Sequence, residues 1–252
     1  MAQCALCLMA HPDDGEIFAG GTLALLAQKG WKIHIASMTP GDCGSREYSA
    51  SDVSRMRRAE GAKAAALIGA TYHCLDRRDL RIFYDDPTVT AAVELLRSIR
   101  PDVVFTHPPS DYMLDHEMTS TVTRAACFAA SAPNYDTGRR PFAEPTEHIP
   151  HLYYASPASG INLFGEPAKF SVMVDTTEVI EVKAEMLACH ESQRVWLQQQ
   201  HGMDHYVEEM RHWSREMGKR LGVEHAEGFR QHMGHPYPQS DLLVETLGAK
   251  RV

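Results

Sequence analysis

The chain has no long hydrophobic segment. None of its apolar runs approaches the roughly 20 residues that a membrane-spanning helix requires, so no membrane span is expected. At the N-terminus only the stretch from Cys4 to Ala10 is apolar before His11 interrupts it. A secretory signal peptide needs a charged region followed by a longer apolar one. The sequence therefore predicts a cytoplasmic protein.

The chain also has little positive charge. Its 25 lysine and arginine residues are outnumbered by 33 aspartate and glutamate residues, which gives a formal net charge of -8. Nucleic acids and anionic membranes are bound through a basic surface. Both are therefore excluded as main partners, and a neutral or cationic small molecule is favoured.

Two common kinds of binding motif are missing as well. There is no G-x-G-x-x-G fingerprint, and the glycine-containing stretch from Thr39 to Ser45 lacks the lysine of a phosphate-binding P-loop. This stretch is interpreted as the rim of a pocket or as a plain turn. Cys4 and Cys7 form a C-x-x-C pair, but residues three apart in a strand point to opposite faces. These thiols are expected to be reduced and buried rather than metal-bound.

What the chain does contain is an alternation of short apolar runs and longer helical patterns, which predicts a single Rossmann-like α/β domain over residues 1–252 with a mostly parallel sheet between helical layers. The segment 132–150 holds four prolines and is predicted to be a loop that forms a lid over the substrate. A C-terminal helical segment is expected from about residue 177. Strands are predicted at 4–10, 31–38, 71–75, 102–106, 151–155 and 170–175, and helices at 16–29, 51–68, 87–99, 115–130, 177 to about 200, and 204–221.

The sequence His11-Pro12-Asp13-Asp14 stands where the first predicted strand turns into the first predicted helix. Side chains at the carboxyl ends of strands in open α/β sheets point into the usual ligand-binding crevice. Imidazole and carboxylate together suit a zinc-like ion, and two adjacent aspartates allow one to bind metal while the other accepts a proton. The structural alternative is an N-capping aspartate in a proline turn.

A second cluster, Asp115-His116-Glu117, follows the predicted strand 102–106 and opens another helix. Because this is again the end of a strand, both clusters are expected at one edge of the sheet. His11, Asp14 and His116 would then make a three-ligand metal site.

The pattern A-H-P-D-D-x-E-x-x-x-G-G from Ala10 to Gly21 resembles the signature of the LmbE-like, or PIG-L, zinc-dependent N-acetylglucosaminyl de-N-acetylases. Further matches are an R-R-A-E segment at 57–60, the Asp115-His116 pair, and a K-x-x-x-x-x-x-H-x-S-Q segment that begins at Lys183. The resemblance extends over roughly the whole chain and implies the LmbE-like fold.

The resemblance also implies a reaction. A zinc-activated water would remove an N-acetyl group from an amino-sugar-containing small molecule, and Fe²⁺ or another divalent metal could serve in place of Zn²⁺. Related proteins commonly assemble, so a homo-oligomer is compatible with it. The roles that it carries over are metal ligands at His11, Asp14 and His116, a general base at Asp13, an acidic catalytic group that orients or tunes the site at Asp115, and substrate contacts at Arg57 and Asp79.

The chain departs from the family pattern at Met113. Many members have H-P-D-H here and use the first histidine to polarise the substrate carbonyl, whereas this chain has Met113-Leu114-Asp115-His116. Either another group supplies that role, with His107, Asp111 and Tyr112 nearby, or the chemistry is weaker.

Two alternatives therefore stay open. One is a zinc amidase or esterase that acts on a non-sugar substrate. The other is a non-catalytic module that binds a glycan or metabolite and keeps the metal as structure. His232 and His235 flank a glycine turn, and they could approach the pocket from the C-terminal segment or from a neighbouring subunit.

Overall fold

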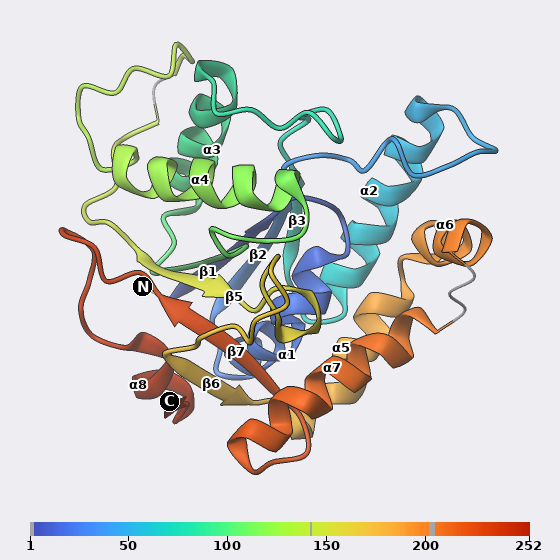
Figure 1. Ribbon diagram of the computed structural model, residues 1–252. Coiled ribbons are helices and arrows are strands. Elements are labelled where there is room, and N and C mark those ends of the chain that lie inside the picture. Colours follow the sequence, from blue (N-terminus) through green and yellow to red (C-terminus); the bar gives the residue numbers. More distant parts are fainter. Residues whose placement is uncertain (1–2, 142, 202–204) are drawn as a thin grey trace.

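A single mixed β-sheet forms the centre of the protein (Figure 1). The computed structural model describes residues 3–141, 143–201 and 205–252. The strands lie in the order β3-β2-β1-β4-β5-β7-β6-β8. Their bounds are Cys4–Met9 (β1), Lys32–Ser37 (β2), Thr71–Cys74 (β3), Val103–Thr106 (β4), His151–Ala155 (β5), Val172–Asp175 (β6), Ala226–Gln231 (β7) and Lys250–Arg251 (β8).

The first five strands of the chain, β1 to β5, are parallel. The direction in which successive strands extend the sheet reverses at β1. From β1 the chain adds β2 and β3 on one side, and then β4 and β5 on the other. Such a reversal opens a crevice at the carboxyl ends of the two central strands, which is where open α/β sheets bind ligands. The expected α/β fold with a mostly parallel sheet is confirmed.

Helices cover both faces of the sheet and make it the middle of three layers (Figure 1). On one face, α1, α2, α5 and α8 bury one set of alternating β1 side chains, and on the other face α3 and α4 bury the opposite set. No helix among the described residues is long and apolar enough to cross a membrane. The helices are Asp14–Gln28 (α1), Ala50–Ala66 (α2), Asp86–Ile99 (α3), Leu114–Ala129 (α4), Ile180–Ala188 (α5), Glu191–His201 (α6), Tyr206–Leu221 (α7) and Leu242–Leu247 (α8).

The C-terminal part differs from the sequence-based expectation. The helix expected from 177 to about 200 is broken at 189–190 into α5 and α6, and the strands β7 and β8 were not expected at all. The β7 sequence A-E-G-F-R-Q has no apolar run, because one of its inward positions is taken by Glu227. This carboxylate is tolerated in the interior since a lysine pairs with it.

The proline-rich segment 132–150 does not lie over the crevice. It runs along the outer side of α3 and α4 (Figure 1), where Arg97 of α3 donates hydrogen bonds to the carbonyl oxygens of Ala132 and Tyr135 at 2.9 and 3.0 Å. None of the described residues of this segment lines the cavity discussed below. The buried guanidinium explains the placement, because it needs these carbonyl groups as partners.

A buried ion pair joins strand β7 to helices α5 and α1. The Lys183 ammonium of α5 lies 2.8 Å from Glu227 Oε1 of β7. The same carboxylate accepts the backbone N–H groups of Gly21 and Thr22 at 2.8 Å each. A Cβ atom at Gly21 would lie 2.7 Å from the Thr176 side chain, so this position of the G-G pair allows a close approach that no other residue permits.

Replacing Lys183 with methionine is expected to destabilise the protein by about 3–5 kcal/mol, because the Glu227 carboxylate would remain buried without a countercharge. Chemical denaturation measures the change. Lys219→Met is the matched control, since Lys219 forms an exposed pair with Glu216 and such pairs contribute about 1 kcal/mol or less. Equal loss of stability in the two variants would contradict the role given to the buried pair.

Candidate metal centre

The turn between β1 and α1 carries the first group of site residues. Asp13 has a φ of 99°, a left-handed conformation that costs energy for a non-glycine residue and is found where the surroundings hold it in place. Asp13 precedes α1 directly, but its side chain makes no capping hydrogen bond. The capping alternative therefore does not explain this aspartate.

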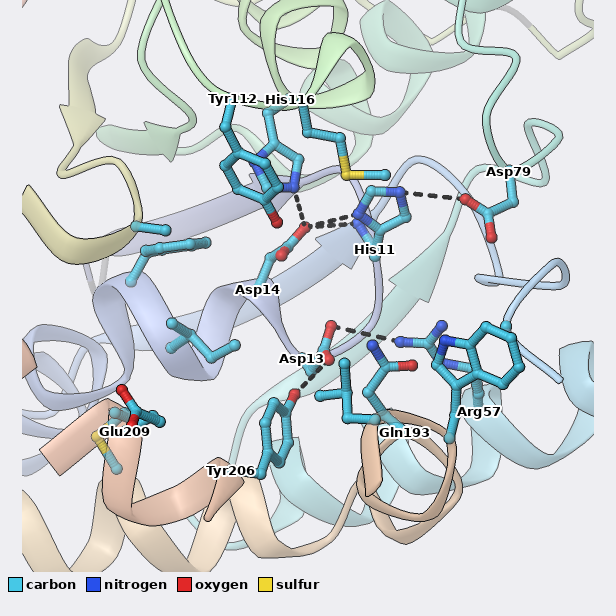
Figure 2. Close-up of a pocket in the computed structure, with 18 of the residues that line it drawn as sticks. His11, Asp13, Asp14, Arg57, Asp79, Tyr112, His116, Gln193, Tyr206 and Glu209 are labelled. Atoms are coloured by element: carbon cyan, nitrogen blue, oxygen red, sulfur yellow. Dashed lines mark hydrogen bonds and ion pairs between the residues drawn. The ribbon is translucent and has the colours of Figure 1, made fainter. Parts of the chain in front are cut away.

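The three residues expected to bind metal lie together (Figure 2). Asp14 Oδ2 is 3.2 Å from His11 Nδ1 and 3.6 Å from His116 Nε2. His116 reaches this point from the first turn of α4, which begins beyond the carboxyl end of β4 next to β1. Asp14 and His116 are buried and His11 is nearly so.

Carboxylates lie beside the other ring nitrogen of each histidine, as a hydrogen bond at His116 and as ion pairs at His11. His11 Nε2 lies 3.2 Å from Asp79 Oδ1 and 3.4 Å from Asp115 Oδ2, and His116 Nδ1 lies 3.1 Å from Asp111 Oδ1. Metal-binding histidines commonly donate their second N–H to a carboxylate in this way, which leaves the first nitrogen free for the ion.

The charge of the cluster also fits a cation. Burial lowers the pKa of the His11 imidazole, but the three carboxylates around it outweigh that effect and raise the pKa well above its ordinary value. A buried space with such an excess of negative charge requires compensation. The residues therefore fit a divalent metal held by His11 Nδ1, Asp14 and His116 Nε2, a donor set typical of catalytic zinc sites.

Asp115 lies behind His11 rather than in the cavity. One of its oxygens accepts the backbone N–H of Leu80 at 2.8 Å, and the other accepts that of Ile82 at 3.4 Å. It was expected to be an acidic catalytic group that orients or tunes the site, and its contacts suit a residue that orients His11. Asp79, expected to contact substrate, does line the cavity, and its Oδ2 accepts the Cys43 N–H at 3.1 Å.

The sequence did not predict that His107 lies next to the metal ligands. Its ring stacks on that of His116 with centroids 3.8 Å apart, and its Nε2 lies 3.1 Å from Asp14 Oδ2. Burial and the adjacent His116 lower the pKa of His107 to about 4, so the ring is neutral. It supports Asp14 from behind and does not line the cavity.

Asp13 turns away from this cluster toward two other partners (Figure 2). Arg57 Nη2 lies 3.4 Å from its Oδ1, and the Tyr206 hydroxyl at the start of α7 donates a short hydrogen bond to its Oδ2. Burial raises the pKa of Asp13, while Arg57 opposes the rise. A carboxylate with a raised pKa is suited to act as a general base. No sequence signal pointed to Tyr206, which stands 193 residues away.

Arg57 is buried, and both of its terminal nitrogens, Nη1 and Nη2, donate hydrogen bonds to the protein. Nη1 donates to the Gly41 carbonyl at 3.1 Å, and Nη2 donates to the Pro12 carbonyl at 2.9 Å. Gly41 has a φ of +67°, and a Cβ atom there would lie 2.1 Å from the guanidinium. Arg57 was expected to contact substrate; it lines the cavity, and its contacts also fix the turn that carries Asp13.

A cavity of about 410 Å³ opens beside the metal ligands and Asp13. The predicted rim loop 39–45 contributes Cys43 and Gly44 to it. His232 and His235 are absent from its described lining. His232 bonds to the Tyr154 hydroxyl at 2.9 Å instead, because antiparallel β7 ends at the opposite edge of the sheet. The apolar and aromatic walls are Ile17, Phe18, Leu80, Tyr112, Met113, Ala158, Trp196, Leu197, Tyr206, Met210 and Trp213.

The chain is similar to proteins of known activity. Residues 6–127 match the family model of PIG-L, the GlcNAc-PI de-N-acetylases. A 4-oxalmesaconate hydratase from Pseudomonas putida is 28% identical over 55% of this chain and 57% of its own length. A diacetylchitobiose deacetylase from Thermococcus kodakarensis is 28% identical over 75% of this chain and 69% of its length.

A solved structure agrees with this result. The N,N'-diacetylchitobiose deacetylase from Pyrococcus horikoshii superimposes with a TM-score of 0.78 at 25% identity, over 96% of this chain and 89% of that one. The match with the family model begins in β1 and ends in α4, so it includes both clusters of the candidate metal centre. The match over residues 6–127 and the similar deacetylases therefore support the resemblance to the PIG-L (LmbE-like) family.

Proposed function

We propose that this protein is a zinc-dependent de-N-acetylase that removes the N-acetyl group from an amino-sugar-containing small molecule. The observation that carries the proposal is the separation of two adjacent aspartates. Asp14 faces the histidine pair, whereas Asp13 faces the same cavity but is held by Arg57 and Tyr206. A structural metal site has no need of this second carboxylate.

A bound zinc ion would supply Lewis acidity that polarises the amide carbonyl and makes water a stronger acid. Asp13 accepts the proton of the attacking water and returns it to the leaving amine, so that acetate and a free amine are formed. Arg57 and Tyr206 keep the Asp13 carboxylate oriented for both transfers. The cavity walls exclude bulk water, which strengthens the interactions of these charges.

Tyr112 is the residue that we assign to the role left open at Met113. Its ring meets that of His116 edge-on at 5.4 Å between centroids, and its hydroxyl end points toward the Asp14 side of the cavity (Figure 2). Asp111 and His107 are occupied with His116 and Asp14. Tyr112 is thus placed to donate a hydrogen bond to the oxygen on which negative charge develops.

Tyr112→Phe is expected to lower kcat on the order of a hundredfold, the usual effect of losing one such donor, while metal content stays unchanged. Steady-state kinetics and elemental analysis measure the two quantities. Tyr84→Phe, which changes another exposed tyrosine, serves as the control. Unchanged kcat in Tyr112→Phe would remove this residue from the mechanism.

The similarity to a hydratase suggests a second candidate, the addition of water to an unsaturated polycarboxylate. Such a substrate needs several positive groups. Among the described residues that line the cavity, Arg57 is the one arginine or lysine, and its charge is already paired with Asp13 while Nη1 and Nη2 donate to backbone carbonyl groups. Asp79 and Glu209 add negative charge to the same lining. These charges favour the deacetylase.

The deciding experiment offers the metal-replete protein a panel of N-acetylated amino sugars, matched O-acetyl esters and an unsaturated dicarboxylate. We expect acetate release from the amides. Hydration of the dicarboxylate alone would establish the second candidate, and hydrolysis of esters alone would establish an esterase. Binding of a sugar with no turnover of any compound would identify a binding module.

A further inference from the structure

One face of α7 forms a continuous wall of the cavity. Tyr206, Glu209, Met210 and Trp213 all line it, and their spacing of three, four and seven residues places them on the same side of the helix. The first of them holds Asp13. The wall therefore extends along α7 from Asp13, the proposed general base, to the carboxylate of Glu209 and the indole of Trp213.

Glu209 is a negative charge without a partner in this wall. Within the part of the chain that the structure describes, its carboxylate makes no ion pair or side-chain hydrogen bond, whereas the neighbouring Glu208 lies 3.8 Å from Arg211. Arg57 lies on the other side of the cavity from Glu209 (Figure 2). Because Glu209 is only half-buried, water satisfies it until a ligand arrives.

The groups next to Glu209 match one kind of ligand. Trp213 stands four residues further on, so its side chain lies beside that of Glu209 on the helix. An indole face attracts ammonium and guanidinium groups, and a carboxylate forms a charge-assisted hydrogen bond with the same groups. A polycarboxylate or phosphate would be repelled.

We propose that Glu209 and Trp213 form a subsite for an organic cation, and that the substrate is an N-acetylated compound that carries an ammonium or guanidinium group on its amine portion. The substrate class rests on the proposed deacetylase function, whereas the cation subsite itself does not. The acetamide lies against Asp13 and the metal ligands, and the cationic end extends along α7 to Glu209.

The kinetic test compares two amides that differ in one charge, N-acetyl-1,4-diaminobutane and N-(4-hydroxybutyl)acetamide. Wild type is expected to prefer the cationic amide on the order of tenfold in kcat/KM, the usual effect of one hydrogen bond to a charged group. Glu209→Gln is expected to abolish this preference by lowering kcat/KM for the cationic amide about tenfold. Glu208→Gln is the matched control, because it removes the same charge from the adjacent, outward-facing position.

A binding measurement separates the subsite from the reaction. Calorimetry with n-hexylammonium and with 1-hexanol, neither of which can be hydrolysed, is expected to show tighter binding of the cation to wild type and to Glu208→Gln than to Glu209→Gln. If neither amide is cleaved but this difference appears, the subsite holds and the deacetylase proposal fails. Equal binding of n-hexylammonium to all three proteins, or equal kcat/KM for both amides in wild type, would overturn the subsite.

Discussion

Replacing His116 with alanine is expected to empty the metal centre and abolish acetate release. His116 Nε2 faces Asp14, and its other nitrogen is fixed by Asp111, so the variant loses a ligand that the fold has already oriented. Removing a group that merely supports a ligand costs 10–100-fold in metal affinity, and loss of the ligand itself should exceed about 100-fold. Elemental analysis should find about one metal per chain in wild type and none in the variant.

The control is His232→Ala, which removes an imidazole that bonds to Tyr154 far from the site. It should retain both the metal and the activity. Circular dichroism and thermal unfolding of both variants establish that the fold is intact. A His116→Ala protein that keeps a full complement of metal would show that the ion is held elsewhere.

Asp13→Asn is expected to keep the metal and lose turnover. Asparagine has the shape of aspartate and can still accept a hydrogen bond from Tyr206, but it cannot accept the proton of the attacking water. Loss of a general base lowers the rate by about 10²–10⁴-fold. The effect should appear in kcat, with metal content close to that of wild type.

Asp14→Asn is the informative comparison, because the two aspartates are adjacent and chemically identical. Asp14 contacts His11 and His116, so its amide variant should lose metal as well as activity. The pair therefore separates binding from catalysis within one dipeptide. Equal activity of wild type and Asp13→Asn would disprove the assignment of the base.

Much of the fold could be predicted because its signals are local. Each of the five parallel strands and the antiparallel β6 is a short run with a local signal of its own, and these six expected strands are present within two residues of their expected bounds. Strand β7 carried no such signal, because its buried Glu227 depends on Lys183, 44 residues earlier in the chain. An ion pair between residues so far apart in the sequence leaves no local sequence pattern from which a strand could be predicted.

The amino-acid sequence by itself determined the α/β class and the turn at His11 to Asp14, because strand ends and helix starts are set by neighbouring residues. The family resemblance had assigned Asp14 to the metal and Asp13 to the base, and the tertiary structure supplied the physical arrangement, in which Asp14 faces the histidines and Asp13 faces Arg57 and Tyr206. The tertiary structure alone brought Tyr206 to Asp13 and Glu209 to the far wall of the cavity. Helix α7 packs against α5 and β7, and this docking, rather than any motif, places its side chains in the site.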